Sequence, residues 1–156
     1  MMLFFDGQYP NCAAFIRSRV IGMHPLHHVF RAMVECIEDE ELVKSAMSPG
    51  TYPRIVIEDL RYLSGSRMEV IRGIYQGECR VDKLNHVDLD IVLAEGLEDD
   101  PNFTSMFEHI LLHETVHWGR FIAKKPSRID GKEAGSWFEH LAFNTPFKNH
   151  HEIPCS

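Results

Sequence analysis

The chain has 156 residues, of which 16 are Lys or Arg and 23 are Asp or Glu, so its formal net charge is −7 with His neutral. This length predicts a single domain over residues 1–156, and the apolar fraction of 44% excludes global disorder. The acidic balance argues against nucleic acid as a partner, because a nucleic-acid binder needs a basic face. No apolar run reaches the roughly 20 residues of a membrane-spanning helix, and the first residues do not form a classical signal peptide. Four widely spaced cysteines predict mostly free thiols.

The first third of the chain is predicted to be helical. Apolar residues recur at three- and four-residue intervals over residues 26–37, which indicates a helix with one buried stripe. We expect this helix to span residues 25–47, where a Pro-Gly pair ends it, and a shorter helix over residues 13–21 to precede it.

The middle of the chain changes to short β-branched segments separated by Gly and polar residues, which are typical of strands. These segments are residues 55–57, 69–75 and 89–93. They predict a small, mostly antiparallel sheet. In the last segment, alternate apolar residues would share one face, with Asp88 and Asp90 on the other face, toward solvent.

The helical period returns after this region. An Asp-Pro pair at 100–101 is typical of an N-cap followed by a first-turn proline, and a helix over residues 100–123 is expected to end at a Lys-Lys-Pro sequence. A loop at 130–131 leads to a final helix over residues 133–143. Helices, a small sheet and two further helices predict the α+β class.

Residues His113 to His117 form an HExxH motif inside the helix predicted over residues 100–123. Residues four apart lie one above the other on a helix, so both imidazoles can reach one zinc ion. Glu114 is rotated by one residue from the first ligand, where its carboxylate can contact a water at the metal without binding the metal itself. Burying these side chains is costly unless a partner satisfies them. We therefore expect Zn2+ as the cofactor, His113 and His117 as ligands, and Glu114 as the general base.

Two histidines do not complete a zinc site, so a third ligand must come from another part of the chain. A metzincin would need Gly at position 120 and His at position 123, whereas Arg120 and Ala123 stand there. A gluzincin takes a Glu from a following helix, and Glu139 and Glu133 are the two candidates there. Asp130 is a minor third option.

Helix geometry favours Glu139 over Glu133. Gly135, four residues before Glu139, would share its face and permit close approach to the active-site helix. Phe143, four residues after Glu139, would pack on the same side. Because the two glutamates are six residues apart, about 240° around the helix, they cannot both point at the metal. Glu133 is then expected to compensate the helix dipole in the first turn.

A family resemblance is carried by the segments 111–119, 130–131 and 133–139. They are similar to the metallopeptidase toxin 3 family, whose members are zincin-like catalytic domains of bacterial polymorphic toxins and secretion-system effectors. The resemblance implies a gluzincin-type protease, secreted or delivered into a target cell by a specialised secretion system, with a cognate immunity protein that protects the producer. The spacing of Glu139 and Phe143 also resembles the third-ligand segment of clostridial neurotoxin light chains, which supports Glu139.

The sequence thus predicts a zincin-like α+β endopeptidase in which Glu114 assists the attack of water on a peptide bond of a target-cell protein. Residues 88–94 are the candidate edge strand that would bind this protein or peptide substrate as an added strand. Five residues are candidates for stabilising the oxyanion, namely Tyr75, Arg120, His140, His150 and His151. Three alternatives stay open: a zinc-stabilised interaction domain without turnover, a zinc hydrolase acting on a non-peptide amide of the cell wall, and a degenerate domain that serves only as the target of an immunity protein.

Overall fold

The computed structural model describes residues 1–5, 7–61 and 72–145. Its central feature is a four-stranded sheet with the order β1-β2-β4-β3. The strands are β1 (Met2–Leu3), β2 (Arg54–Glu58), β3 (Gly73–Ile74) and β4 (His86–Asp90). Together with the helices described below, this sheet confirms the α+β class.

The direction of the strands differs from the prediction. β2 pairs in parallel with both β1 and β4, and β3 runs antiparallel to β4, so the expected mostly antiparallel sheet is wrong. Strand direction depends on how the chain crosses between strands, which a short β-branched segment does not encode. The strand predicted at 55–57 lies in β2. The segment 69–75 contains β3, and its first three residues lie outside the described part of the chain.

The segment predicted as a strand over residues 89–93 is divided between two elements. β4 ends at Asp90, and α5 (Ile91–Asp99) begins at the next residue. The Asp90 side chain accepts a hydrogen bond from the backbone N–H of Val92 at 3.0 Å and so caps the helix. Residues 88–94 therefore do not form an edge strand, because β4 lies between β2 and β3 and the rest is helical.

The N-terminal third contains α1 (Pro10–Phe15), a π-helical turn (Ile16–Val20), α2 (His28–Ile37) and α3 (Glu40–Ala46). The single helix predicted over residues 25–47 is wrong, because the chain breaks between α2 and α3. Glu38 ends α2 with a φ of 61°, and the Asp39 side chain caps α3 by accepting a hydrogen bond from the N–H of Leu42 at 2.9 Å. Because Asp39 is an N-cap inside the apolar repeat, a second helix starts there, and the first helix ends before the Pro-Gly pair.

The C-terminal half contains α6 (Thr104–Ile122), the hairpin strands β5 (Arg128–Ile129) and β6 (Lys132–Glu133), and α7 (Ala134–Phe143). α6 and α7 confirm the two helices predicted in this region. Asp100 caps the one-turn 3-10 helix that leads into α6, as expected of its Asp-Pro pair. Asp130 and Gly131 form the hairpin turn, with φ values of 49° and 78°.

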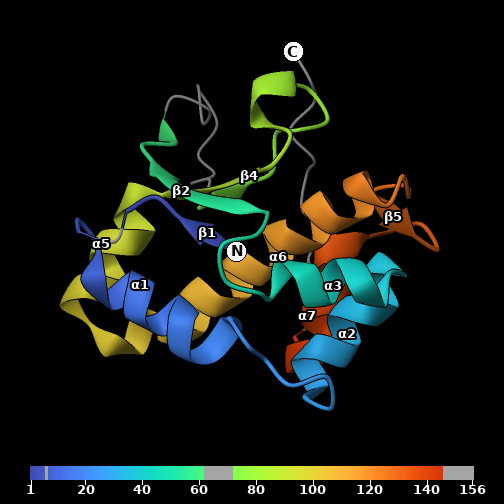
Figure 1. Cartoon of the computed structure of the whole chain (residues 1–156), viewed down its shortest axis with the longest axis horizontal. Coiled ribbons are helices and arrows are strands. Elements are labelled where there is room, and N and C mark those ends of the chain that lie inside the picture. Colours follow the sequence, from blue (N-terminus) through green and yellow to red (C-terminus); the bar gives the residue numbers. More distant parts are fainter. Residues whose placement is uncertain (6, 62–71, 146–156) are drawn as a thin grey trace.

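α6 connects the sheet to the other helices. It packs against β4 and β3 on one side and against α2 and α7 on the other (Figure 1). Leu111, Leu112 and Val116 of α6 are fully buried in this core. The helix that carries HExxH is thereby fixed from both sides, which is the condition for a precise site.

Asp88 and Asp90 are buried, although the sequence predicted them on a solvent-facing side. Asp88 pairs with the Lys83 ammonium at 3.1 Å, and Lys83 also contacts Glu58 of β2. Burial raises the pKa of Asp88 to about 6, although the Lys83 charge acts in the opposite direction. A local ion pair therefore holds Oδ1 of Asp88, whereas its buried Oδ2 has no hydrogen-bond partner among the described residues.

The cysteines follow the sequence prediction only in part. Cys12 and Cys36 are free and buried, and burial raises the pKa of both thiols to about 12. Cys79 is disulfide-bonded, contrary to the expectation of mostly free thiols. Cys155 lies outside the described residues.

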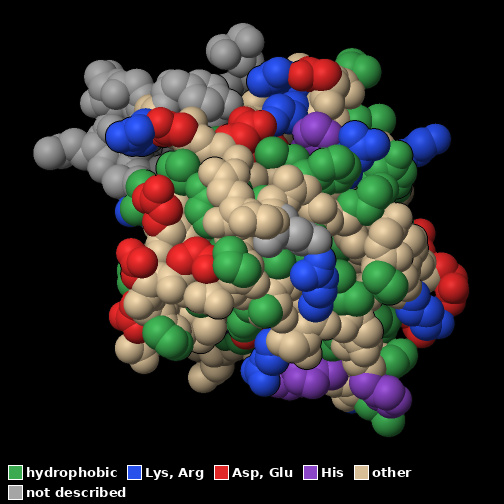
Figure 2. Space-filling model, turned by 60° about the vertical axis from the view of Figure 1, so that its left-hand side comes forward, with side chains coloured by type: hydrophobic (Ala, Val, Ile, Leu, Met, Phe, Trp, Pro, Cys, Tyr) green, Lys and Arg blue, Asp and Glu red, His purple; other side chains and the backbone are tan. Residues whose placement is uncertain are grey.

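The surface carries mixed charge. On the face shown in Figure 2, Lys and Arg side chains are scattered among acidic and apolar ones. Among the described residues, no helix has the length and apolar character needed to cross a bilayer. The expectation that nucleic acid is not a partner stays a prediction.

The hairpin turn gives a test of backbone strain. An Ala at position 131 would meet no atom within 4 Å but would have to adopt a φ of +78°. We expect Gly131→Ala to lower the free energy of unfolding by about 1–2 kcal/mol, measured by urea denaturation. Gly7→Ala is the matched control, because position 7 is equally open and has no positive φ. Equal midpoints for the two variants would contradict the turn geometry.

The buried Asp88 predicts a pH-dependent stability. Because its folded pKa is about 6 against an ordinary 3.8, the folded state holds this proton more tightly, and stability is lost as pH rises through this interval. We expect Asp88→Asn to gain about 2–3 kcal/mol relative to wild type between pH 4 and pH 7. Urea midpoints at several pH values measure this difference, and a difference that does not change with pH would contradict the assignment.

Candidate metal centre

α6 presents the two histidines of the HExxH motif to the same side. His113 and His117 are one turn apart, with ring centroids 5.1 Å apart and Nε2 atoms 3.3 Å apart. His113 is 9% exposed, and His117 is half-buried. The spacing of the motif therefore brings both imidazoles together, as helix geometry requires.

Glu133 completes a group of three candidate ligands. Its Oε1 lies 2.5 Å from Nε2 of His117, and its Oε2 lies 3.7 Å from Nε2 of His113. Glu133 is also the N-cap of α7, because its carboxylate accepts hydrogen bonds from the N–H groups of Gly135 at 2.7 Å and Ser136 at 2.6 Å. The helix N-terminus thus holds this carboxylate beside both histidines.

Glu139 occupies a different position from the one that the sequence favours. Its Oε1 lies 2.9 Å from Nδ1 of His113, the ring nitrogen that faces away from His117 and Glu133. The structure therefore places Glu133, the second candidate from the sequence, near Nε2 of both histidines. Glu139 lies at the other ring nitrogen of His113. The two glutamates do point in different directions, as their separation predicts. Which one faces the histidines depends on how α7 lies against α6, and the sequence does not contain that orientation.

Gly135 and Phe143 behave as predicted. A Cβ atom at position 135 would lie 2.4 Å from Nε2 of His113, so only glycine permits this approach of α7 to α6. The Phe143 ring stacks on His109, one turn before His113, with centroids 3.8 Å apart. These contacts define where α7 sits on α6.

Opposite charges inside the group shift its titration. Burial alone would lower the pKa of His113, but the hydrogen bond to Glu139 and the charges of Glu114, Glu133 and Glu139 outweigh it and raise the pKa to about 9. Burial would raise the pKa of Glu133, but the His117 and His113 charges and its hydrogen bonds hold the pKa well below its ordinary value. At neutral pH the carboxylates therefore hold His113 in its cationic form, and a metal ion that binds this imidazole has to displace a proton.

The donor atoms fit a divalent metal ion. One ligand atom from each of His113, His117 and Glu133 can be chosen so that all three lie within 4.8 Å of one another. Two ligands of a tetrahedral zinc ion at about 2.0–2.1 Å are about 3.3 Å apart, which is the observed separation of the two Nε2 atoms. Two imidazoles and a carboxylate are also the donor types that zinc takes in catalytic sites.

Glu114 lies next to this group but points toward the sheet. Its Oε2 accepts a hydrogen bond from the backbone N–H of Tyr75 at 2.9 Å, just after β3. The close approach of β3 depends on Gly73, where a Cβ would lie 2.5 Å from Ile110 and 3.1 Å from Cγ of Glu114. One carboxylate oxygen of Glu114 is therefore held by the strand.

Comparison with protein families assigns the chain. The model of the metallopeptidase toxin 3 family matches residues 5–144. The chain belongs to the metallopeptidase toxin 3 family. No match is found among curated proteins or among solved structures. The match extends well beyond the motif region, so it includes the N-terminal helices and the strands β2, β3 and β4.

In this member of the metallopeptidase toxin 3 family, two oxyanion candidates are bonded elsewhere. The Tyr75 hydroxyl donates to the carbonyl of Leu84 at 3.0 Å, and burial raises its pKa. The Arg120 guanidinium is buried and donates to the carbonyls of Cys36 and Pro126. Arg120 thereby links the end of α2 to the segment after α6, which is a structural role.

The remaining candidates lie outside the group. Nδ1 of His140 lies 3.2 Å from the carbonyl oxygen of Thr145, and Asp130 is exposed in the hairpin turn. His150 and His151 lie outside the described residues. Glu133 caps α7 and faces the histidines at the same time, two roles that were treated as alternatives in the sequence analysis. The sequence signal for this double role is a Glu immediately before a helix.

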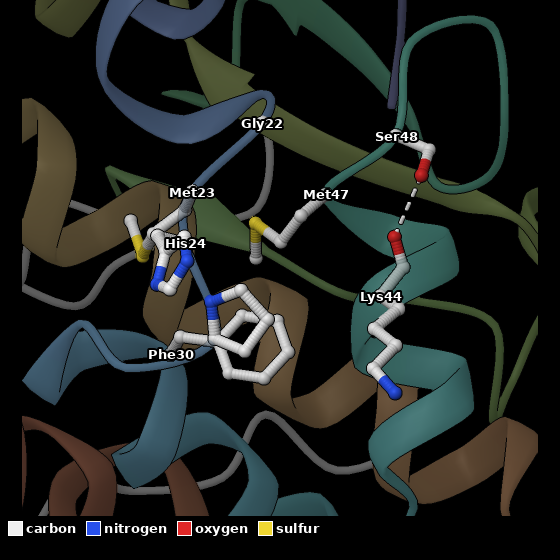
Figure 3. A pocket seen from close by; sticks show the side chains of 8 residues that line it. Gly22, Met23, His24, Phe30, Lys44, Met47 and Ser48 are labelled. Carbon is white, nitrogen blue, oxygen red and sulfur yellow. Dashed lines mark hydrogen bonds between the residues drawn. The ribbon is translucent and has the colours of Figure 1, made fainter.

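A pocket of about 250 Å³ lies elsewhere in this family member (Figure 3). It is formed where the segment before α2 meets the end of α3, and its lining includes Met23, His24, Phe30 and Met47. None of its lining residues belongs to the histidine–glutamate group. This hollow is therefore separate from the candidate metal centre.

Gly135 gives a test of the centre's geometry. In Gly135→Ala the added methyl group would collide with the His113 ring and displace Nε2. We therefore expect zinc affinity to fall by about tenfold or more, as it does when a residue that orients a metal ligand is lost. Competition with a chromophoric chelator measures this affinity. Gly96→Ala is the matched control, because its Cβ would collide with Phe103, outside the centre. Equal zinc affinity in both variants would contradict the described contact.

Proposed function

We propose that this chain is a zinc-dependent endopeptidase of the gluzincin type, in which His113, His117 and Glu133 hold zinc and Glu114 is the general base. The observation that carries the proposal is the convergence of one atom from each ligand within 4.8 Å, directly beside Glu114. Membership of a family described as metallopeptidase toxins supports the same chemistry. Glu133 takes the place of Glu139 as third ligand because of its distance to both histidines.

The residues around the centre fit hydrolysis of an amide. When bound, zinc supplies Lewis-acid chemistry, which polarises a carbonyl and brings the pKa of water toward neutrality. Glu114 takes the proton of the attacking water and passes it to the leaving amine. The N–H of Tyr75 holds one oxygen of Glu114, so the other oxygen performs this transfer from a fixed position.

β3 is the strand best placed to hold an extended substrate. It is an edge strand of the described sheet, and Tyr75 just after it contacts Glu114. An extended peptide that pairs with this edge would bring its backbone past the proposed base. β3 thus takes the role that the sequence analysis gave to residues 88–94.

The number of protein ligands distinguishes a catalytic zinc site from a zinc-stabilised interaction domain. A structural zinc site has four protein ligands, whereas the described residues bring three together, with a glutamate beside them. That arrangement favours turnover over a zinc-stabilised interaction domain. A cell-wall amide as substrate remains an outcome of the experiments below. Delivery into a target cell and protection by a cognate immunity protein are proposals that rest on the toxin family.

Glu114→Gln tests the proposed base. We expect this variant to bind zinc as wild type does, and to lose hydrolysis of a protein substrate by a factor of about 100 or more, because no group accepts the proton. Metal content by elemental analysis and turnover of protein and of peptidoglycan are measured in parallel. Wild-type turnover in a zinc-loaded Glu114→Gln sample would remove the assignment, and cleavage of peptidoglycan alone would identify the cell-wall alternative.

His117→Ala and Glu133→Gln test the proposed ligands. Each removes one of three donors, so we expect zinc to be lost on dialysis against a chelator that leaves wild type loaded. Full zinc occupancy in either variant would contradict the ligand set. Expression of wild type and Glu114→Gln in the cytoplasm and in the periplasm of a test bacterium would then show where hydrolysis is toxic.

A further inference from the structure

Glu139 is the carboxylate that the proposed ligand set leaves without a role. We propose that Glu139 is a positioning residue, which holds His113 through Nδ1 so that Nε2 faces the metal. This inference rests on the proposed function, because it needs a metal at Nε2. It assigns to Glu139 a task different from that of ligand, and it follows from the contacts of the His113 ring.

The two nitrogens of His113 face opposite partners. Nδ1 lies 2.9 Å from Oε1 of Glu139, whereas Nε2 lies 3.3 Å from Nε2 of His117 and 3.7 Å from Glu133. With a metal ion at Nε2, the imidazole is neutral and carries one proton, and an ionised carboxylate accepts hydrogen bonds but donates none. The Glu139 contact therefore keeps the proton on Nδ1, and the lone pair of Nε2 is directed at the ligand group.

The ring orientation is restricted from both sides. A ring flip about the Cβ–Cγ bond would replace Nδ1 by a carbon atom and leave the Glu139 carboxylate without its hydrogen bond. The side chains of His113 and Glu139 are only 11% and 14% exposed, so water does not readily replace that bond. Gly135 lies over the face of the same ring, where a Cβ atom would come within 2.4 Å of Nε2, 2.5 Å of Cδ2 and 2.6 Å of Cε1.

α7 and its N-cap residue supply the two carboxylates. Glu133 caps the N-terminus of α7, and Glu139 projects from the next turns of that helix toward the other nitrogen of His113. Phe143 stacks on His109 of α6 and so helps to hold α7 in place, and Phe138 of α7 packs edge to face on Phe143. The position of α7 on α6 therefore sets the ligand and its orienting residue together.

The test compares Glu139→Ala and Glu139→Gln in the full chain. We expect zinc affinity, measured by chelator competition, to fall about 10- to 100-fold in Glu139→Ala. Glu139→Gln keeps an acceptor for the Nδ1 proton and should recover most of this loss. Co2+ added in place of zinc should give the same visible absorption bands in wild type and both variants, because the coordinating atoms do not change. In NMR spectra of the zinc-loaded protein, the Nδ1 proton of His113 should be protected in wild type and exchange rapidly in Glu139→Ala.

Glu108→Gln is the control for lost negative charge, because Glu108 lies on α6 and belongs to neither the ligand group nor its contacts. It should bind zinc as wild type does. Unchanged affinity in Glu139→Ala would overturn the proposal, and so would altered Co2+ bands like those of Glu133→Gln, which would make Glu139 a ligand. If Glu139→Ala does not fold, as judged by circular dichroism, Glu139→Gln tests the proposal instead. Its Co2+ absorption bands and the exchange rate of its His113 Nδ1 proton are then compared with those of wild type. Failure of the proposed function is distinguishable, because His117→Ala and Glu133→Gln would then retain zinc.

Discussion

The contact between α6 and α7 is the constraint on which the candidate site depends. Along this contact, the His113 imidazole of α6 lies between two carboxylates: Glu139 of α7 is at Nδ1, and Glu133, the N-cap of α7, is near Nε2. Burying an imidazole and two carboxylates is costly unless they satisfy one another. The same helix contact that buries apolar residues of the core therefore also assembles the polar group of the candidate metal centre.

The sheet contributes the other half of the arrangement. β3 approaches α6 closely because position 73 is glycine, and the N–H of Tyr75 then reaches the Glu114 carboxylate. α6 thus presents His113 and His117 toward α7 and Glu114 toward an edge strand. A helix fixed between a strand and another helix can direct adjacent residues to separate tasks, namely metal binding on one side and proton transfer on the other. This division agrees with the metallopeptidase chemistry of the family.

Glycines and a buried arginine maintain this geometry. Gly73 and Gly135 permit two close approaches to α6, and Gly119 permits a third, since a Cβ there would lie 2.5 Å from Ile37 of α2. Arg120 joins α2 to the segment that leads from α6 to the hairpin. That hairpin places Glu133 at the start of α7. The position of the third proposed ligand is therefore set by contacts several elements away from the histidines.

Features that depend on local periodicity and capping could be predicted from the residues alone. The 3.6-residue helical repeat brings His113 and His117 to one side of α6 and turns Glu114 to the neighbouring side, and Asp100 and the Asp-Gly turn mark element boundaries. Three further features became apparent in the folded chain: β2 and β4 are parallel, Asp88 is buried beside Lys83, and Glu133 rather than Glu139 lies near both Nε2 atoms. The reason is physical: rotation of α7 about its own axis and the crossing between strands are set by packing of distant residues, and no local pattern specifies them.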